Sequence, residues 1–499
     1  MPESVSHISL IERMRRRGIC AVIPTFNNAG TIADVVRRTL NECADVYVVN
    51  DGSTDETPTI LASIEGITVV TLPCNSGKGA ALKAGFRRAM ADGFAYAITL
   101  DADGQHFPED IPTVVQASIA NPRAIIIGER RNLEAMERSA GSKFANSFSN
   151  FWFAVQTGTR LRDTQTGFRL YPLHKLVGLG LLTSRYEAEL ELLVLASWNG
   201  VRIVPVPVNV YYPPAEKRVS HFRPALDFTR ISVLNTILCF AALLVALPCR
   251  IVRVLLIALR TLYSLLFYLV NSLLVLTPTA AAMKIIGRSP DRVAETLRRM
   301  LCFFARIIVQ WHGYPGVKTT IENVGGHDFS RPAVIVSNHQ SHFDLMAMLA
   351  LTPNLVVLTN DWVWRSPFYG YVIRNAEYFP VSAGIDTLMP RLRELVAKGY
   401  SIAVYPEGTR SSDGSIGRFH SGAFYIAEQL GLPIVPAVMY GANHVLPKGQ
   451  CYMRKGMMRF IIDAAVAETQ ETPLKTASWM RRYFISRLAD ISDRYDRYQ

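Results

Sequence analysis

The sequence has few cysteines, and they are not arranged as a disulfide-bonded or zinc-binding protein requires. Among 499 residues there are 7 cysteines, at positions 20, 43, 74, 239, 249, 302 and 451, and no two of them form a CxxC pair. Scattered cysteines in odd number are typical of reduced thiols in the cytosol. We therefore expect neither a disulfide framework nor a zinc site.

The sequence also offers little support for a signal peptide or for nucleic-acid binding. Arg15, Arg16 and Arg17 precede an apolar stretch from Ile19 to Ile23, but this stretch is too short for a signal peptide. A net charge of +12 and a pI near 9.4 favour an anionic partner. No basic and aromatic pattern typical of RNA binding is present, so we expect no nucleic acid and favour phospholipid or a phosphorylated substrate.

Charge is missing altogether from a long stretch near the middle of the chain. No charged residue lies between Arg230 and Arg250, and the apolar character continues from Ile251 to Met283. The run from Ile231 to Leu247 would form a helix of roughly 25 Å, which is marginal for a full membrane span. Arginines 250, 253 and 260 share one helical face, as in a helix that lies in the headgroup layer.

The flanks of this segment are basic on both sides. The residues are Lys217, Arg218, Arg223 and Arg230 before it, and Lys284, Arg288 and Arg292 after it. If positive charge marks the cytoplasmic side, both ends lie there, which favours an even number of crossings or a shallow hairpin over a single span. We thus expect association with the cytoplasmic face of the inner (plasma) membrane. The alternative is a pair of helices buried in a soluble protein.

A chain of this length should hold about two to four domains. In the first half, short apolar strands alternate with helical patterns from Cys20 onward. This alternation predicts an α/β domain with a parallel sheet and helices on both faces, whose ligands bind beyond the carboxyl ends of the strands.

Polar residues gather where those strands end. Asn50 and Asp51 end the second strand, and Asp101, Asp103 and Gln105 follow the strand from Tyr96 to Leu100. Two carboxylates spaced by one residue can share a hard divalent ion such as Mg²⁺ or Mn²⁺, which would also hold a diphosphate.

Four motifs in this order carry a resemblance to a known family. They are Pro24-Thr-Phe-Asn-Asn28, Val49-Asn-Asp-Gly-Ser-Thr-Asp55, Asn75-Ser-Gly-Lys-Gly-Ala-Ala81 and Asp101-Ala-Asp-Gly-Gln105. Together they resemble the family 2 inverting glycosyltransferases with a GT-A (Rossmann-like) fold, and most closely the polyprenol-phosphate sugar synthases of the dolichol-phosphate mannose synthase type. The resemblance covers about residues 18 to 225.

The resemblance implies roles for particular residues. It places Asp51 and Lys78 in substrate binding, with Asp51 on the nucleotide, and Asp101, Asp103 and Gln105 around the metal, with Asp103 catalytic. It further implies substrate contacts for the following residues: Arg130, Arg169, and the pair Arg138 and Ser142 that would grip an acceptor phosphate.

Two positions depart from the family pattern. Asn28 stands where a glutamate is usual, and the segment Arg218-Val-Ser-His-Phe-Arg223 replaces a Gly-x-Ser-Lys element. A lipid phosphate acceptor needs no general base, whereas a hydroxyl acceptor does. Glu189 is the candidate base in the second case.

The second half carries a different constellation. An amphipathic helix from Asp291 to Gln310 is followed by a strand, Ala333 to Val336, that leads into His339 and Asp344. A carboxylate five residues after a histidine can fix the imidazole tautomer, so that the other ring nitrogen takes a proton from a hydroxyl. His342 is the alternative base.

Asn338-His339-x4-Asp344, Tyr405-Pro-Glu-Gly-Thr-Arg410 and Ile434-Val-Pro436 resemble the glycerolipid acyltransferases of the lysophosphatidic acid type, over about residues 284 to 470. The resemblance implies His339 as general base, Asp344 as its orienter, and Glu407 and Arg410 in acceptor binding. The donor would be acyl-CoA or acyl carrier protein, with no cofactor. The usual phosphate-binding arginine of the second motif is missing, and Arg365 and Arg374 are the candidates to replace it.

The sequence therefore predicts a fused, bifunctional enzyme of lipid biosynthesis. We expect a GT-A glycosyltransferase domain at 1–228, membrane-associated helices at 229–283 and an α/β acyltransferase domain at 284–499. The partners would be a nucleotide-sugar donor, an acyl donor, a lipid acceptor and the membrane. The competing interpretation is a single phospholipid-type acyltransferase whose glycosyltransferase-like domain only binds or docks lipid.

Overall fold

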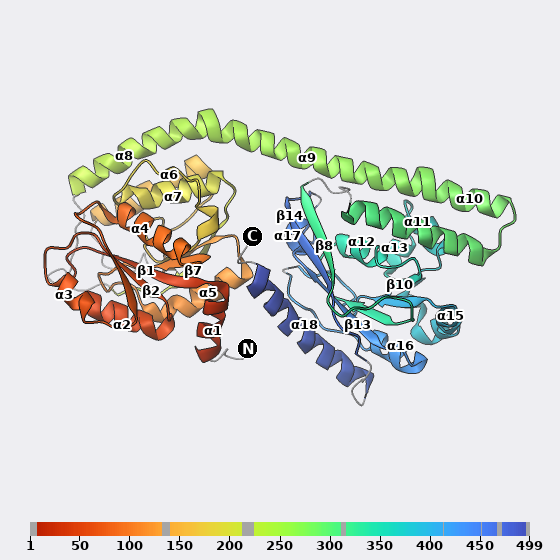
Figure 1. Ribbon diagram of the computed structural model, residues 1–499. Helices are drawn as coiled ribbons and strands as arrows, with labels where there is room; N and C mark the ends of the chain where they lie inside the picture. The colour runs from red at the N-terminus through yellow and green to blue at the C-terminus, as the bar shows by residue number, and fades with distance from the viewer. Residues whose placement is uncertain are drawn as a thin grey trace. The chain divides into compact units, whose positions relative to one another are not determined.

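The computed structural model describes residues 7–131, 140–211, 224–310, 316–412, 414–450, 452–466 and 472–495. The chain divides into two compact units, residues 1–251 with 493–499, and residues 252–492. Each unit is built around its own seven-stranded sheet (Figure 1).

The first sheet has the strand order β3-β2-β1-β4-β6-β5-β7. Its strands are β1 (Ile19–Thr25), β2 (Val46–Asn50), β3 (Ile67–Thr71), β4 (Tyr96–Thr99), β5 (Ile125–Arg130), β6 (Arg169–Pro172) and β7 (Ile203–Val208). The strands β1 to β4 pair in parallel, as the alternation predicts, but β6 runs antiparallel to both β4 and β5. Strand β6 lies outside the strands on which that prediction was based, and alternation along the sequence does not determine its direction.

The antiparallel direction of β6 has a consequence for the site. The residues before Arg169 reach the same edge of the sheet as the carboxyl end of β4, since Thr99 pairs with Arg169. The segment Gln165 to Phe168 is thereby placed next to Asp101.

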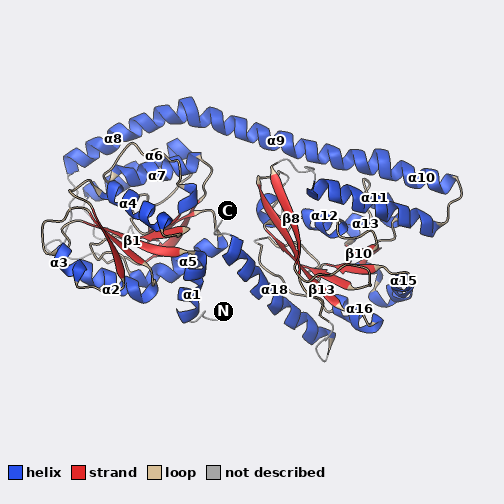
Figure 2. Cartoon of the chain, in the orientation of Figure 1, coloured by secondary structure: helices blue, strands red, loops and turns tan. Residues whose placement is uncertain are grey.

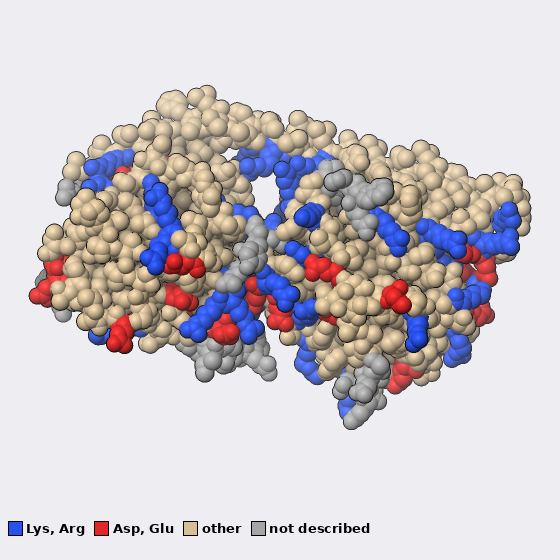
Figure 3. Space-filling view, in the orientation of Figure 1, with Lys and Arg blue, Asp and Glu red and all other residues tan. Residues whose placement is uncertain are grey.

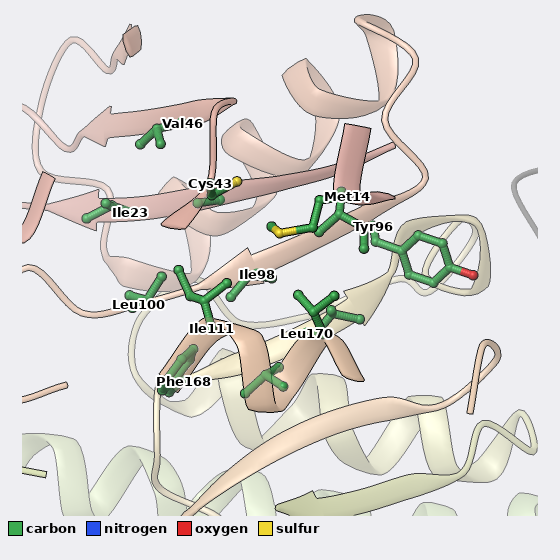
Figure 4. Close-up of a cluster of buried hydrophobic side chains, with 14 of the residues drawn as sticks. Met14, Ile23, Cys43, Val46, Tyr96, Ile98, Leu100, Ile111, Phe168 and Leu170 are labelled. Carbon is green, nitrogen blue, oxygen red and sulfur yellow. The ribbon is translucent and has the colours of Figure 1, made fainter. Parts of the chain in front are cut away.

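Helices cover both faces of this sheet. They are α1 (His7–Arg17), α2 (Ile32–Glu42), α3 (Thr57–Ala62), α4 (Lys78–Ala91), α5 (Ile111–Ala120), α6 (Ala140–Thr157), α7 (Glu187–Trp198) and α8 (Pro224–Ala241). Side chains of α1, α2 and α5 pack on one face, and Figure 4 shows part of this core, with Met14, Ile98 and Leu170 among its members. Side chains of α4, α6, α7 and α8 form the core on the other face.

The second sheet has the order β11-β10-β12-β9-β13-β14-β8 and is parallel except between β13 and β14. Its strands are β8 (Val317–Asn323), β9 (Val334–Ser337), β10 (Leu355–Thr359), β11 (Phe379–Pro380), β12 (Ser401–Val404), β13 (Ile434–Tyr440) and β14 (Gly456–Ile462). Its helices are α11 (Pro290–Gln310), α12 (Phe343–Leu349), α13 (Asp361–Trp364), α14 (Gly370–Asn375), α15 (Ile385–Ala397), α16 (Gly422–Leu430), α17 (Ala442–Val445) and α18 (Pro473–Tyr495). The predicted amphipathic helix is confirmed as α11.

The central apolar stretch is one helical segment without a reversal (Figure 2). It comprises α8, a π-helical turn (Ala242–Ala246), α9 (Leu247–Val270), a second π-turn (Asn271–Leu276) and α10 (Thr277–Ile285). Each π-turn precedes a proline, Pro248 or Pro278, and the wider turn accommodates a residue that lacks the N–H of a regular helix. The expected hairpin is wrong, because neither proline breaks the helix.

Candidate active sites

The first candidate site lies at the carboxyl end of β4. Asp101 and Asp103 follow this strand, and Lys78, the first residue of α4, reaches between two acids. Its Nζ lies 2.6 Å from Asp101 Oδ1 and 2.8 Å from Glu189 Oε2. Asp103 Oδ1 accepts a hydrogen bond from the Gln105 backbone N–H at 3.0 Å. The structure therefore brings the predicted residues 78, 101, 103 and 105 together.

The two aspartates differ in their preference for a proton. Burial and the negative charge of Asp101 raise the pKa of Asp103 to about 6. Burial is the largest single influence on the pKa of Asp101 and would raise it. The charges of Lys78, His106 and Arg169, with the hydrogen bond from Lys78, together hold that pKa below its ordinary value. The site thus carries negative charge that a further cation would neutralise.

The donor set fits an oxygen-preferring ion that also takes ligands from a substrate. Asp101 and Asp103 supply two carboxylates, and Gln105 follows two residues later, bound to Asp103 through its backbone N–H. The described residues contain no group of three or more His, Cys, Asp or Glu that could hold a metal alone. Gly167 leaves room for the Asp101 carboxylate, because a Cβ there would lie 2.4 Å from Asp101 Oδ2. Mg²⁺ is commonly bound by one or two carboxylates together with substrate phosphates.

Asp51 is buried, and both of its carboxylate oxygens accept hydrogen bonds from the loop that precedes α4. Its two carboxylate oxygens accept hydrogen bonds from the backbone N–H groups of Ser76 and Gly77, both at 2.8 Å. Gly52 permits this approach, since its φ is +70° and a Cβ there would meet the Cys74 backbone at 2.6 Å. Asp51 therefore shapes the loop that delivers Lys78, and its contact with a nucleotide stays a prediction.

The predicted arginines are held by protein groups. Arg130 forms two hydrogen bonds with the buried carboxylate of Asp163, at 2.5 and 2.7 Å. Arg169 has no exposed surface and donates to the carbonyls of Thr164, Thr166 and Glu189. Both arginines fix the segment before β6, so the structure gives them positioning roles and does not show them facing a substrate.

Several predicted positions lie outside what the structure describes. Arg138 and the segment from Arg218 to Arg223 are outside the described residues, and Ser142 lies in α6 with a side chain that is not described. Asp163, in contrast, is a functional neighbour that the sequence reasoning missed. Its position two residues before Gln165 was the only available signal.

Glu189 is not poised as a general base. One of its oxygens is bound to Lys78, and the other, Oε1, is buried with no hydrogen-bond partner among the described residues. The oxygen that Lys78 occupies is directed at the ammonium and not at an acceptor hydroxyl. The geometry therefore favours an acceptor that needs no base.

Replacing Lys78 with methionine is expected to destabilise the first unit. The change leaves Asp101 and Glu189 side by side without their shared cation, and breaking a buried ion pair costs about 3–5 kcal/mol. In a thermal-unfolding experiment, the first unit of the variant should unfold at a lower temperature than that of the unchanged protein. Adding Glu189→Gln to Lys78→Met should restore part of the loss, and no recovery in the double variant would contradict the pairing.

The second candidate site lies after β9. His339 Nδ1 is 3.1 Å from Asp344 Oδ2, and the same oxygen accepts the backbone N–H groups of Gln340 at 2.5 Å and Ser341 at 2.8 Å. Asp344 is fully buried at the start of α12. It can hold the Nδ1–H tautomer of His339, which leaves Nε2 free to accept a proton.

Glu407 supports His339 through the backbone. Its Oε1 accepts the His339 N–H and its Oε2 accepts the Gly417 N–H, both at 2.8 Å. Burial raises the pKa of Glu407. The predicted contact of Glu407 with the acceptor stays a prediction, because both oxygens already hold the loops that frame the site.

His342 is the weaker candidate for the base. His342 keeps exposed surface, but desolvation by the surrounding cavity wall, together with the charges of Arg410 and His339, lowers its pKa to about 4. Its ring packs against Trp362 with centroids 5.5 Å apart, and Asp344 bonds His339 instead. These contacts favour His339.

A cavity of about 360 Å³ opens beside His339. Its polar lining includes His342, Arg410, His420 and Lys448, and most of the remaining lining is apolar. Arg365 and Arg374 are absent from this lining among the described residues, and Arg374 Nη1 donates to the Trp364 carbonyl at 2.7 Å. Their role in place of the missing arginine stays a prediction. Lys448 and His420 were missed because they lie outside the recognised motifs.

A second cavity, of about 440 Å³, is largely apolar. It lies between α9, α11 and α12 and includes Leu265, Ala305 and Met346 in its lining. His342, Leu345, Trp362 and Val363 line both cavities, so the two are neighbours within the second unit.

Comparison with known proteins identifies both parts. Residues 20–171 match the model of glycosyl transferase family 2, and residues 317–440 match the acyltransferase model. A polyprenol monophosphomannose synthase of Mycolicibacterium smegmatis is 31% identical over 38% of this chain and 75% of its own length. A chloroplastic 1-acyl-sn-glycerol-3-phosphate acyltransferase of Brassica napus is 34% identical over 33% of this chain and 50% of its own length.

Among solved structures, a glucosyl-3-phosphoglycerate synthase of Mycobacterium tuberculosis in complex with Mn²⁺ and UDP is similar, at 22% identity and a TM-score of 0.35, over 49% of this chain and 82% of that one. The chain spans about half the length of the two plant acyltransferases that it matches. The resemblance predicted from the motifs is confirmed: the chain belongs to glycosyltransferase family 2 through its N-terminal part, which is fused to an acyltransferase domain of the lysophosphatidic acid type.

Proposed function

We propose that this chain is a bifunctional, membrane-associated enzyme. It transfers a sugar from a nucleotide-sugar to a lipid acceptor with inversion, and an acyl group from acyl-CoA or acyl carrier protein to a hydroxyl. Its functional parts are residues 1–228, 229–283 and 284–499. The observation that carries this proposal is that each unit holds an assembled constellation where its central strands end, Lys78 with Asp101 and Asp103 in one and His339 with Asp344 in the other.

The acyl transfer follows from the geometry at His339. Nε2 takes the proton of the acceptor hydroxyl while the hydroxyl oxygen attacks the thioester carbonyl. The C–S bond then breaks, and the leaving thiolate takes that proton from Nε2, so that a thiol departs and His339 is neutral again. Asp344, fixed by two backbone N–H groups, stabilises the positive imidazole that forms.

The apolar cavity between α9, α11 and α12 is suited to the acyl chain of the donor. It shares four lining residues with the cavity beside His339. An acyl chain that enters this cavity is removed from water, and its burial stabilises binding by about 0.8 kcal/mol for each CH₂ group. The length of this cavity would therefore set the preferred chain length.

Filling that cavity is expected to change donor preference. Ala305 is buried on α11 and lines the cavity, so Ala305→Leu should lower kcat/KM for oleoyl-CoA about tenfold relative to decanoyl-CoA. Ala294→Leu on the same helix is the control, since Ala294 is equally buried but is absent from that lining. Overpacking costs about 1–3 kcal/mol in either variant. If the ratio of kcat/KM for oleoyl-CoA to that for decanoyl-CoA is the same in both variants, the assignment of this cavity to the acyl chain is contradicted.

The sugar transfer is proposed to use a divalent cation held by Asp101, Asp103 and Gln105. When bound, Mg²⁺ or Mn²⁺ would neutralise the diphosphate that leaves the sugar. Lys78 holds Asp101 in its charged form, and Asp51 positions the loop that carries Lys78. Because Glu189 is paired with Lys78, an acceptor that is already a lipid phosphate fits this site better than a hydroxyl.

The membrane contact is assigned to the long helix. The segment Leu226–Ile285 has 60 residues and is long and apolar enough to cross a membrane. At ~1.5 Å per residue it extends for about 90 Å, three times the ~30 Å hydrocarbon core. A helix this long, with large apolar side chains exposed along it, is suited to lying in the membrane surface.

The two sides of this long helix differ in the polarity of their side chains. Figure 3 shows that the visible surface over the helix is almost free of charged side chains. Two of its arginines contact protein instead: Arg250 donates to the Thr157 carbonyl at 3.3 Å, and the Arg260 side chain lies beside Gly316. Basic residues therefore border the folded units, and apolar residues are left for lipid.

Placing charge on the apolar side is expected to weaken membrane binding. Leu244, Leu255 and Leu266 are 71%, 56% and 51% exposed and are spaced by about three helical turns. The triple glutamate variant should lower the fraction that floats with phospholipid vesicles at least tenfold. Leu474→Glu, at a residue that is 60% exposed on α18, is the control. Unchanged flotation of the triple variant would contradict the assignment.

The proposal is tested by following both transferred groups at once. Purified protein is given a membrane lipid extract, a panel of labelled UDP- and GDP-sugars, and labelled acyl-CoA or acyl carrier protein. The proposal predicts that both labels enter extractable lipid. Acyl incorporation alone, with every sugar tested, would support the alternative in which the first unit only docks lipid.

A further inference from the structure

Tyr405 carries a buried hydroxyl beside the proposed base of the second site. It is the residue after β12, whose Val404 pairs with Val336 of β9, and β9 leads to His339. The ring centroids of Tyr405 and His339 lie 4.5 Å apart, with an angle of 31° between the ring planes. The aromatic ring of Tyr405 therefore packs against the imidazole itself.

The Tyr405 hydroxyl does not open into the cavity beside His339. Tyr405 lines this cavity, but its hydroxyl oxygen is buried and has no hydrogen-bond partner among the described residues. Burying a hydroxyl without a partner costs free energy, so nearly all such groups in folded proteins are paired. The partner of this hydroxyl must lie on the protein side of the ring, because a substrate in the cavity cannot reach a buried oxygen.

Asp344 offers a matching acceptor. Its Oδ2 accepts hydrogen bonds from His339 Nδ1 and from the backbone N–H groups of Gln340 and Ser341. Its other oxygen, Oδ1, is also buried and accepts no hydrogen bond within the described part of the chain. Hydrogen bonds to a carboxylate favour its charged form, which is the form that stabilises a positive imidazole.

The charge of Asp344 reaches the Tyr405 hydroxyl. Burial and the negative charge of Asp344 raise the pKa of Tyr405 well above its ordinary value. The hydroxyl therefore keeps its proton and can donate it to a hydrogen bond. The two unpaired groups do not bond each other directly, and a buried water molecule typically bonds about three polar groups that would otherwise be unpaired.

We propose that Tyr405 is a positioning residue for the His339–Asp344 pair, and that its hydroxyl binds one water molecule that donates to Asp344 Oδ1. This inference rests on the proposed acyl transfer. With both oxygens held, the carboxylate cannot rotate, so Oδ2 stays aligned with His339 Nδ1 and Nε2 stays aligned with the acceptor hydroxyl. The ring of Tyr405 supplies packing, and only its hydroxyl supplies this link.

Tyr405→Phe tests this role, because it removes the hydroxyl and keeps the ring. Acyl transfer from oleoyl-CoA to a membrane lipid extract is measured. The loss of one hydrogen bond to a charged group should lower kcat about tenfold, with the KM for oleoyl-CoA unchanged. Tyr483→Phe is the matched control, since the Tyr483 hydroxyl donates to Asp463 at 2.8 Å in the same unit but away from His339. It should leave kcat unchanged.

The same substitution in the Asp344→Asn background separates positioning from packing. Effects of independent residues add, whereas effects of residues that act through one another do not. Because the hydroxyl acts through Asp344, Tyr405→Phe should lower kcat by less than about twofold in the Asp344→Asn protein. A loss of equal size in both backgrounds would assign the effect to packing and overturn the inference, as would an unchanged kcat in Tyr405→Phe alone.

Thermal unfolding separates this inference from the proposed activity. If the hydroxyl is bonded as proposed, Tyr405→Phe leaves Asp344 Oδ1 without its partner and should lower the unfolding temperature of the second unit by about 2–4 °C. If the hydroxyl has no partner, the substitution removes an unpaired buried group, and an unchanged or raised unfolding temperature would overturn the inference. A lowered temperature in a protein without detectable acyl transfer would contradict the proposed transfer while the bond to Asp344 stands.

Discussion

Replacing His339 with alanine is expected to lower the rate of acyl transfer by roughly 10²- to 10⁴-fold, the range that a positioned general base contributes. The change removes the nitrogen that takes the acceptor proton, while Asp344 keeps its bonds to the Gln340 and Ser341 N–H groups. The loop around the site should therefore stay folded. The measurement is acyl transfer from oleoyl-CoA under single-turnover conditions, with sugar transfer by the same preparation as the internal reference.

His342→Ala is the matched control for this experiment. His342 lines the same cavity and lies three residues away, but its contact is with Trp362 and its pKa is lowered to about 4. We expect a change of less than about tenfold, which a packing defect can produce. A large loss in His342→Ala together with an active His339→Ala would show that the base has been assigned to the wrong residue.

Asp103→Asn is expected to remove sugar transfer, by about 10²- to 10³-fold, and to leave acyl transfer unchanged. The substitution keeps the shape of the side chain but removes one of the two carboxylates proposed to hold the divalent cation, and losses of this size follow the removal of one group that stabilises charge in a transition state. Activity would be measured with saturating Mg²⁺ or Mn²⁺. A variant that retains full sugar transfer would exclude Asp103 from the site.

For Asp103→Asn we also predict a change in stability, which can be tested without an activity assay. The pKa of Asp103 is raised to about 6, so the ionised carboxylate is disfavoured in the folded state. Its contribution to stability is present below pH ~3.8 and is lost as the pH rises through about 6. At pH 7 and without metal, Asp103→Asn should therefore unfold at the same temperature as the unchanged protein or higher. Addition of Mn²⁺ should stabilise the unchanged protein and not the variant.

Much of both sites could be predicted from the sequence, because the chemistry-bearing residues lie in short motifs at strand ends. Asp101 and Asp103 immediately follow a buried strand, and so does the segment that leads to His339. The five-residue spacing from His339 to Asp344 sufficed to predict their contact, since a turn and the start of a helix bring them together. These relations are local in the chain, and local relations can be read from sequence.

What could not be predicted depends on contacts between distant segments. The direction of β6 is fixed by pairing with β4, about 70 residues earlier, and nothing within the strand itself encodes it. The same holds for Arg130 and Arg169, whose partners are buried groups supplied by other segments. A motif identifies an arginine but does not show whether its guanidinium faces a substrate or the protein interior.

The prediction for the central helix was wrong for a different reason. Basic residues on both flanks indicated an even number of crossings or a shallow hairpin, but the helix continues through the π-turns before Pro248 and Pro278. Lys448 was missed because a lysine in a surface turn carries no signal until the cavity that it lines is known. In both cases the deciding information is three-dimensional.

One chain is proposed to perform two different transfers on membrane lipid. The most direct measurement is mass spectrometry of lipids from cells that produce the unchanged protein, Asp103→Asn or His339→Ala. With the unchanged protein we predict a lipid that carries both a sugar and an acyl group. With Asp103→Asn the sugar should be missing, either from the acylated lipid alone or together with the acylated product. With His339→Ala the acyl group should be missing. If both variants yield the same lipids as the unchanged protein, or if both lose only the acyl group, the claim of two enzymes in one chain is contradicted.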